Sequence, residues 1–232
     1  MKPILLLAPL VAAALAAPAL PAAAKFPEKP IRLVVGFPPA GATDILARVV
    51  AAKVGEMQKW EIVVDNKPGA AGNVGADIVA KAPADGHTWM LTQIATHGIV
   101  PSLYKKLPFD SVKDFAGVTQ LVGVPNVISA CKGFPAETIA DVVRIAKEKP
   151  GTVTFASSGN GTSLHMSGQL LKVLAGIDIV HVPYRGAGPA LNDCLGGNIS
   201  LIVNNFPATV AHVQAGTLKP LAVTTTERAP QY

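Results

Sequence analysis

The chain alternates between two hydrophobic periodicities, one typical of buried strands and the other of amphipathic helices. A near-continuous apolar run of strand length covers residues 31–37, and strands are also predicted over 61–66 and 88–94. The segment after the first run repeats at helical spacing instead, and its apolar face consists of Ile45, Leu46, Val49, Val50 and Val54. Thr43 or Asp44 can cap that helix, and we expect a second helix over 73–82.

A less regular stretch covers 95–123, and the alternation then starts again. Strands are predicted at 124–130, 152–157, 178–184, 199–205 and 218–225. Helices are predicted at 137–149, 163–175, 189–195 and 207–216. Repeated strand–loop–helix units predict an α/β fold with mainly parallel sheets, and the restart predicts two such sheets.

The first 24 residues have the pattern of a secretory signal peptide rather than of a folded segment. Lys2 precedes an apolar region, and Ala22 and Ala24 form a small-residue cleavage pattern just before Lys25. Prolines interrupt the apolar region, whereas a membrane span needs about 20 uninterrupted apolar residues. We therefore expect a mature protein that begins at Lys25 and is exported to the periplasm.

Composition narrows the class of partner only weakly. The 20 lysines and arginines exceed the 15 acidic residues but form no basic run, which argues against a nucleic-acid partner. The two cysteines, Cys131 and Cys194, lack the spacing of a metal site, and we expect no metal. Export permits a disulfide. One pair in a chain of this length is no disulfide scaffold, however, and we expect two buried free thiols.

Two glycine-containing loops that follow predicted strands are the main candidates for a ligand site, because ligands of α/β sheets bind at the carboxyl ends of the strands. The first loop, "PPAGATD" over 38–44, leads into a helix whose free amides and dipole favour an anion. A plain capped turn without a ligand is the alternative reading of this loop. The second loop, over 157–163, has the same design and adds hydroxyl groups that can donate to a carboxylate.

Other interpretations of the second loop fail on spacing. A phosphate-binding P-loop needs a lysine after its last glycine, and a dinucleotide fingerprint needs a third glycine where Leu164 stands. A small serine hydrolase would use Ser158 with His165, but no serine here has the flanking glycines of a G-x-S-x-G elbow. No acid is singled out to complete a triad. We expect His165 to face a ligand or to bond the loop.

Three further features have a functional and a structural interpretation. His181 lies inside an apolar strand, and we expect a buried, hydrogen-bonded histidine. Arg185 follows the same strand and is equally compatible with a carboxylate partner and with a solvated cation. The glycines at 69, 72 and 75 suit an amide nest, but close packing of a helix on a sheet explains them slightly better.

Five stretches of the chain share their order and spacing with one protein family: "FPEKPIRLVVGFPPAGATDILARVVA", "VVDNKPGAAGNVGADIVAKAPADGHTWML", "ATHGIVPSLYKKLPFDSVKDFAGVT", "FASSGNGTSLHMSG" and "VPYRGAGPALNDCLGGNISLIVNN". They resemble the substrate-binding proteins of tripartite tricarboxylate transporters, the Bug family. The resemblance runs from about residue 26 to 232. It implies a two-lobed, Venus-flytrap fold of the type II periplasmic binding proteins, with lobe 1 over 25–123 and lobe 2 over 124–222.

The resemblance also implies a function and a site. Such a protein is no enzyme and uses no cofactor; it captures a small carboxylate and delivers it to the permease subunits of a tripartite tricarboxylate-type transporter. We expect a monomer, and an exported sensor for a signalling partner would grip its ligand in the same way. Matched by motif, the implied substrate-binding residues are Pro39, Ala40, Gly41, Thr43, Asp44, Thr96, Ser157, Gly159, Asn160, Gly161, Thr162, Ser163, His165, Tyr184, Arg185 and Asn205.

The sequence departs from the family pattern at three places. Ala40 replaces the first glycine of P-P-G-G, and its methyl group would crowd the amide approach or require a negative φ. Asn204 stands where the family commonly has an acidic residue. Family members continue past "TERAPQY", so the resemblance implies a first lobe that is incomplete at its C-terminal part, with 223–232 beginning the return to it.

Overall fold

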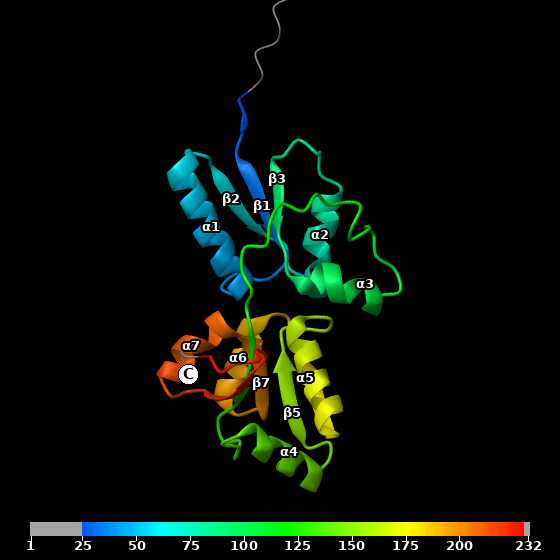
Figure 1. Ribbon diagram of the computed structural model, residues 1–232, viewed down its shortest axis with the longest axis vertical. Coiled ribbons are helices and arrows are strands. Elements are labelled where there is room, and N and C mark those ends of the chain that lie inside the picture. The colour runs from blue at the N-terminus through cyan, green and yellow to red at the C-terminus, as the bar shows by residue number, and fades with distance from the viewer. Residues whose placement is uncertain (1–24, 230–232) are drawn as a thin grey trace, which may run out of the picture.

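The structure is a computed structural model that describes residues 25–229, so the predicted signal peptide lies outside the described residues. The chain folds around two separate sheets, which form two lobes placed one after the other along the long axis of the molecule (Figure 1). The α/β, two-lobed fold expected from the sequence is therefore confirmed.

Lobe 1 is a three-stranded parallel sheet in the order β2-β1-β3. Its strands are β1 (Ile31–Val35), β2 (Ile62–Asn66) and β3 (Thr88–Leu91). Figure 1 shows α1 on one side of this sheet and α2 and α3 on the other. These helices are α1 (Ala42–Gln58), α2 (Asn73–Ala80) and α3 (Val100–Leu103), with a 3-10 turn (Ala70–Gly72) before α2 and a π-helical turn (Ala95–Ile99) before α3.

Lobe 2 is a five-stranded sheet in the order β6-β5-β7-β4-β8. Its strands are β4 (Asn126–Ala130), β5 (Val153–Ser157), β6 (Ile179–Pro183), β7 (Leu201–Asn205) and β8 (Lys219–Val223). Its helices are α4 (Ile139–Glu148), α5 (Ser163–Ala175), α6 (Ala187–Gly196) and α7 (Phe206–Gln214). The pairs β5–β6 and β5–β7 are parallel, but β4 runs antiparallel to both of its neighbours.

The helices of lobe 2 seal both faces of its sheet. Phe155, Leu201 and Val203 point to the face where α4 and α5 pack, and they form one buried cluster with the apolar sides of those helices. Ala156 and Ile202 point to the opposite face and pack against α6. Residues 104–125, which contain no helix or strand, form the long linker that passes beside lobe 1 before it enters β4 (Figure 1).

The expectation of two free thiols is wrong, because Cys131 and Cys194 form a disulfide. Cys131 directly follows β4, and Cys194 lies near the end of α6; both are buried. The two cysteines are 63 residues apart in sequence. They meet because the antiparallel pairing of β4 with β7 returns the end of β4 to the α6–β7 connection, where the Cys131 amide donates to the carbonyl of Ser200.

The predicted inner face of α1 is also wrong in part. Ile45 and Val49 are 44% and 59% exposed, whereas Asp44 and Ala47 are buried. Neither Thr43 nor Asp44 is the N-cap, because the helix begins at Ala42 with Gly41 as its N-cap. The rotation of the helix follows from Asp44, whose carboxylate is hydrogen-bonded inside the lobe and turns this side of the helix inward.

Candidate functional site

Two cavities lie where the lobes face each other. The first, which we call the linker-side cavity, has a volume of about 590 Å³ and is lined by Ala42, Thr43 and Gln93 of lobe 1, by Asn126, Ser163 and Asn205 of lobe 2, and by residues 119–124 of the linker. The second, which we call the arginine-side cavity, has a volume of about 560 Å³. Its walls are residues 36–38, 68–72 and Tyr104 from the first half of the chain and 158–160 and 183–186 from lobe 2.

Glycines of lobe 2 stand where the lobes come closest. A Cβ on Gly186 would lie 2.8 Å from Cγ of Pro38, and one on Gly161 would lie 3.2 Å from Cδ2 of Leu103. Both glycines have a positive φ, so a side chain there would strain the backbone as well as push the lobes apart. These two glycines therefore permit the close approach of the lobes on which the cavities depend.

Two helix N-termini supply hydrogen-bond donors to the linker-side cavity. Helix α1 begins at Ala42 after a glycine without a side-chain cap, and α5 begins at Ser163. The amides of such first turns lack partners within the helix, and the helix dipole favours negative charge there. The Thr43 hydroxyl accepts from Nε2 of Gln93 at 3.0 Å, which leaves its own proton for a ligand. The Ser163 hydroxyl has no hydrogen-bond partner within residues 25–229.

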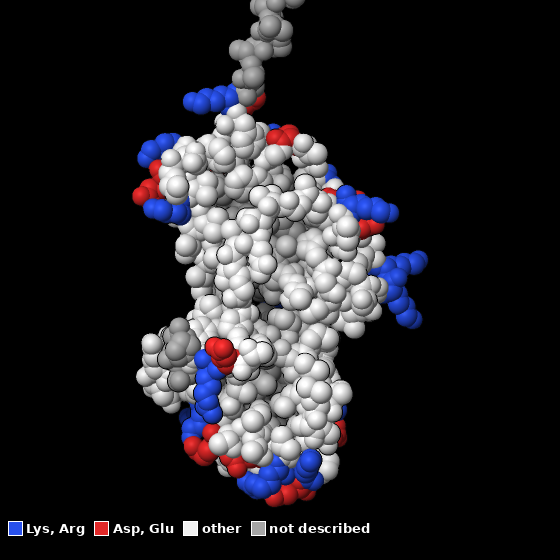
Figure 2. Space-filling model, in the orientation of Figure 1, with Lys and Arg blue, Asp and Glu red and all other residues white. Residues whose placement is uncertain are grey.

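The linker-side cavity carries dipoles but few charges. Among the described residues that line it there is no lysine, arginine, aspartate or glutamate. On the face that Figure 2 displays, the waist between the lobes is largely uncharged, and the charged side chains lie above and below it. An anion bound in this cavity would be held by hydrogen bonds and helix dipoles, as backbone amides at helix N-termini can do.

The first loop is organised around the buried carboxylate of Asp44. This carboxylate accepts hydrogen bonds from the Ala40 amide at 3.0 Å, from Nε of Arg48 at 3.0 Å, and from Nδ2 of Asn66 at 2.9 Å. Burial alone would raise the pKa of Asp44, but these hydrogen bonds and the Arg48 charge outweigh it and hold the pKa below its usual value. Asp44 thus shapes the loop from inside lobe 1 and lines neither cavity.

Ala40 adopts a conformation that the sequence argued against. Its φ is +64°, in the left-handed region that favours glycine, so the expectation of a negative φ is wrong. The hydrogen bond from its amide to Asp44 holds the residue in this conformation. Pro39, Ala40 and Gly41 line neither cavity.

The second loop is held by its own hydroxyl groups. Ser157 is fully buried, and its Oγ lies 2.7 Å from Nε2 of His181. Thr162 is buried as well; its hydroxyl donates to the carbonyl of Gly159 at 2.8 Å and accepts from the His165 amide as the N-cap of α5. These hydroxyls shape the loop that faces lobe 1, and their hydrogen bonds are made within lobe 2.

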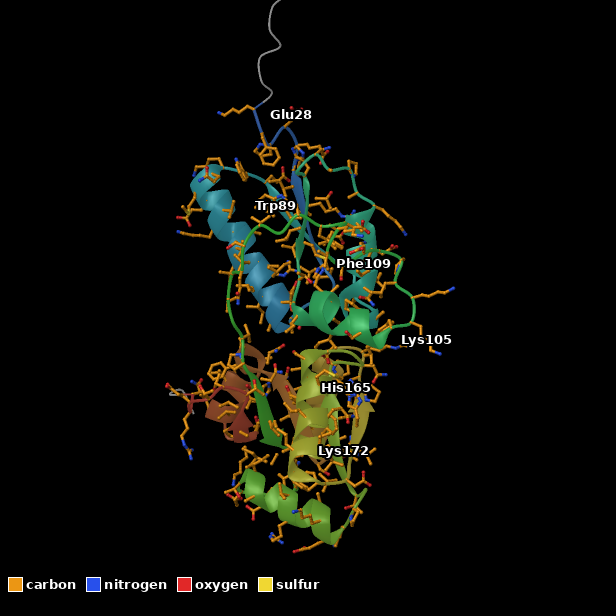
Figure 3. All side chains as sticks on the ribbon, turned by 45° about the vertical axis from the view of Figure 1, so that its right-hand side comes forward. Glu28, Trp89, Lys105, Phe109, His165 and Lys172 are labelled. Atoms are coloured by element: carbon orange, nitrogen blue, oxygen red, sulfur yellow. A yellow bond between two sulfur atoms is a disulfide. The ribbon has the colours of Figure 1, made fainter. Side chains whose placement is uncertain are left out.

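Two histidine rings stack on each other, and each is hydrogen-bonded to this loop. His165 accepts from the Gly161 amide through Nδ1 at 3.3 Å, which confirms that it bonds the loop, and Figure 3 shows it at the end of α5 nearest lobe 1. Its ring stacks on His181 with centroids 4.1 Å apart. Burial lowers the pKa of both rings, and the charge of His165 adds to the effect at His181, whose pKa falls to about 4. The sequence predicted a buried, hydrogen-bonded histidine at 181; the hydrogen bond to Ser157 is present, but the ring is only half-buried.

Most of the implied site residues therefore fall into three groups. Thr43, Ser163 and Asn205 line the linker-side cavity. Gly159, Asn160, Tyr184 and Arg185 line the arginine-side cavity. Asp44, Thr96, Ser157 and Thr162 are buried and hydrogen-bonded within their own lobes, with the Thr96 hydroxyl donating to the carbonyl of Ala71.

The sequence interpretation missed Gln93 and Asn126, which both line the linker-side cavity. Gln93 lies near the end of a predicted strand without any motif, and Asn126 lies inside a mostly apolar predicted strand. A polar residue in such a strand can indicate a functional position. Its partner is known only from the pairing register of β4 and β7, which places Asn126 directly opposite Asn205. The packing interpretation of the glycines at 72 and 75 is confirmed, since a Cβ on Gly75 would lie 2.9 Å from Cα of Gly36.

The described residues form no recognisable catalytic or metal centre. Ser158 makes no hydrogen bond to His165 in the part of the chain that the structure describes, and the buried Ser157–His181 pair has no carboxylate partner on its histidine there. Residues 25–229 hold no cluster of three or more histidine, cysteine, aspartate or glutamate side chains suited to a metal ion. Within the same residues, no helix has the length and apolar character needed to cross a membrane.

Comparison with known families gives a match over most of the chain. Residues 46–232 match the family described as "Tripartite tricarboxylate transporter family receptor". Among curated proteins, a protein encoded in the tcbD-tcbE intergenic region of Pseudomonas sp. (strain P51) is 36% identical over 89% of this chain and 61% of its own length. BugT of Bordetella pertussis is 33% identical over 89% of this chain and 64% of its own length. The chain thus spans less than two thirds of the length of these two relatives.

Solved structures agree with this match. The structure titled "R. palustris Rpa4515 with adipate" is 36% identical, with a TM-score of 0.85 over 88% of this chain and 68% of that one. MatC from Rhodopseudomonas palustris with bound malate is 30% identical, with a TM-score of 0.82 over 88% of this chain and 70% of that one. The periplasmic binding protein BugD is 32% identical, with a TM-score of 0.83 over 88% of this chain and 68% of that one.

Proposed function

Because this chain belongs to the tripartite tricarboxylate transporter family receptors, we propose that it binds a small carboxylate between its two lobes and serves as the solute-binding component of such a transporter. The observation that carries the proposal is the linker-side cavity. There the N-termini of α1 and α5 meet from opposite lobes, each with a hydroxyl group, Thr43 or Ser163, that can donate to a carboxylate. Two similar structures, Rpa4515 with adipate and MatC with malate, agree with this ligand class.

Isothermal titration of the chain against a panel of di- and tricarboxylates tests the proposal. We expect at least one member to bind, and Thr43→Val to weaken it by about tenfold, because the variant removes a donor from a carboxylate that remains buried. Thr152→Val is the matched control, since Thr152 lies beside the end of β5 farthest from the cleft. Absence of binding across the panel, by a chain whose circular dichroism and melting show that it is folded, would overturn the proposal.

The protein acts by binding rather than by catalysis in this proposal. The absence of an elbow motif and the complete burial of Ser157 support this. Esterase activity that disappears in Ser158→Ala would contradict it and favour the hydrolase alternative.

Delivery to a permease and a periplasmic location belong to the same proposal, and they are supported by the family and by the cleavage pattern before Lys25. N-terminal sequencing of the protein recovered from the periplasm should begin at Lys25. Affinity capture from solubilised membranes should recover permease subunits; recovery of a sensor kinase instead would favour a role in signalling.

A further inference from the structure

Four residues of lobe 2 form a hydrogen-bond chain that ends in the linker-side cavity. Nδ2 of Asn205 donates to Oδ1 of Asn126 at 2.9 Å. Nδ2 of Asn126 donates to Oγ of Ser167 at 2.9 Å, and the Ser167 hydroxyl donates to the carbonyl oxygen of Ser163 at 2.9 Å. The two amides meet because Asn126 and Asn205 are direct partners across the antiparallel strands β4 and β7.

The carbonyl oxygen of Ser163, at the end of this series of hydrogen bonds, fixes the donor and the acceptor in each of the other hydrogen bonds. A carbonyl oxygen can only accept, so Ser167 gives its single proton to Ser163 and must itself accept from Asn126. Asn126 therefore turns its nitrogen toward Ser167 and its oxygen toward Asn205. Asn205 must in turn direct its nitrogen toward Asn126, and its own Oδ1 has no hydrogen-bond partner within residues 25–229.

This unpaired oxygen belongs to a residue that lines a cavity with hydrogen-bond donors from both lobes. Asn205 lines the linker-side cavity together with Thr43 and Ser163, whose hydroxyls and neighbouring helix amides suit a carboxylate. An acceptor in such a place is satisfied by a ligand that carries a donor of its own, and a buried acceptor left unpaired weakens binding. The ligand should thus combine a carboxylate with a hydrogen-bond donor.

The charges around the cavity distinguish between the two common donors, a hydroxyl group and an ammonium group. Among the described residues that line the cavity, there is no aspartate or glutamate to offset an ammonium charge. Asp44 belongs to the same helix turn as Thr43, but its carboxylate is bound to Arg48 and Asn66 inside lobe 1. Removing an ammonium group from water without a counter-charge is costly, so the site favours a neutral hydroxyl.

We propose that Oδ1 of Asn205 accepts a hydrogen bond from a hydroxyl group of the ligand, and that this protein prefers hydroxycarboxylates to the same carboxylates without the hydroxyl. The inference rests on the proposed function, since it assumes that a carboxylate occupies the linker-side cavity. Ser167 is a positioning residue: it does not line the cavity, but it fixes which end of the Asn205 amide faces the ligand.

Calorimetry with matched pairs of ligands tests the inference: malate with succinate, 2-hydroxyglutarate with glutarate, and citrate with tricarballylate. In any pair that binds, we expect the hydroxylated member to bind about tenfold more tightly, and we expect aspartate to bind less tightly than malate. Equal affinities within every pair that binds, or tightest binding by aspartate, would overturn the inference and leave carboxylate binding intact. Failure of all these ligands and of the wider carboxylate panel would overturn the proposed function, and the inference with it.

Two variants test the role of these hydrogen bonds. The quantity measured is the ratio of the affinities for the hydroxylated and the plain ligand of a matched pair. Asn205→Ala should bring the ratio of hydroxylated to plain ligand close to one, because the acceptor is gone. Ser167→Ala should lower the ratio to an intermediate value, because the Asn126 and Asn205 amides can then turn either way. Asn192→Ala, at an exposed position on α6, is the matched control and should keep the full ratio.

Melting curves of the variants show whether each remains folded. Should Asn205→Ala fail to fold, Ser167→Ala decides the question, since it changes only a hydroxyl on α5. A folded variant of either kind that retains the full ratio would overturn the assignment of Asn205 Oδ1.

Discussion

The two lobes are built from the same strand–loop–helix unit, but they differ in how completely their sheets are buried. Every residue of β4 in lobe 2 is buried, as are the first four residues of β7. In lobe 1 only the central strand β1 comes close, with every residue but Arg32 buried, and no residue of β2 or β3 is fully buried. A strand is sealed when it has neighbours on both edges and helices on both faces, and a three-stranded sheet has a single strand of that kind.

Exposed apolar side chains show the same difference. In lobe 1 they lie on the edge strand β2 and on the helices of both faces, and they include Ile45, Val49, Met57, Val63, Val74 and Leu103. In lobe 2 they gather on α5 and the neighbouring edge strand, with Leu170, Val173, Leu174 and Val180 exposed, while the inner faces of the sheet stay covered. Coverage of the sheet by helices and neighbouring strands therefore decides how much burial stabilises each lobe.

The chain provides separate probes for the two lobes. Both tryptophans, Trp60 and Trp89, belong to lobe 1, next to β2 and within β3. Tryptophan fluorescence therefore follows the unfolding of lobe 1, whereas far-ultraviolet circular dichroism follows both lobes.

The largest effect is expected from removing the disulfide, which only lobe 2 contains. The double variant Cys131→Ala with Cys194→Ala opens a crosslink across 63 residues, and the loss of this constraint on the unfolded chain costs about 4 kcal/mol. Guanidinium unfolding should show an earlier transition by circular dichroism and little change by tryptophan fluorescence. Coincident transitions that move together would show that the two lobes unfold as one unit.

A matched pair of valines compares the two sheets directly. Val203→Ala in β7 removes a buried side chain and should cost about 2–3 kcal/mol, because the full transfer energy and a cavity are involved. Val64→Ala in β2 removes a half-buried side chain and should cost about 1 kcal/mol. Each cost is the change in the free energy of unfolding from guanidinium titrations followed by both probes. Equal costs would mean that lobe 1 is as well sealed as lobe 2.

The smallest effect concerns the strained loop of lobe 1. Ala40→Gly should stabilise the protein by about 1 kcal/mol, because glycine adopts the left-handed conformation that alanine adopts here at a cost. Ala42→Gly is the control, since Ala42 is the first residue of α1 and the same exchange there should destabilise. Chemical unfolding followed by tryptophan fluorescence measures both changes. A destabilising Ala40→Gly would show that the loop relaxes without strain.

Much of the fold could be predicted because its signals are local. Each predicted strand and helix is present in the structure, with boundaries that shift by only a few residues, and the restart after the irregular stretch does separate two sheets. Hydrophobic periodicity depends on neighbours within one element, and turn residues act on their own backbone. The position of the two loops at the carboxyl ends of strands followed from the same signals.

The directions of the strands and their pairing partners were harder to predict from the sequence. The antiparallel course of β4 was not predicted, and with it the sequence interpretation missed the disulfide and the pairing of Asn126 with Asn205. Strand pairing joins residues that are tens of positions apart in the sequence. The hydrophobic periodicity within one strand does not indicate which strand will lie next to it. The same limit applies to Asp44, whose role depends on Asn66 of the next strand.

The sequence by itself determined the α/β class, the order of the elements and the two loops that form the candidate site. Only the tertiary structure decided which polar groups of those loops face the cavity. Ser157 and Thr162 looked like ligand contacts, yet they are buried and bonded inside their loop, whereas Asn205 lines the cavity and its amide is oriented by Ser167 through Asn126. The physical reason is that a hydrogen bond is shared between two groups, and the second group of each pair is chosen by the packing of segments distant in the chain.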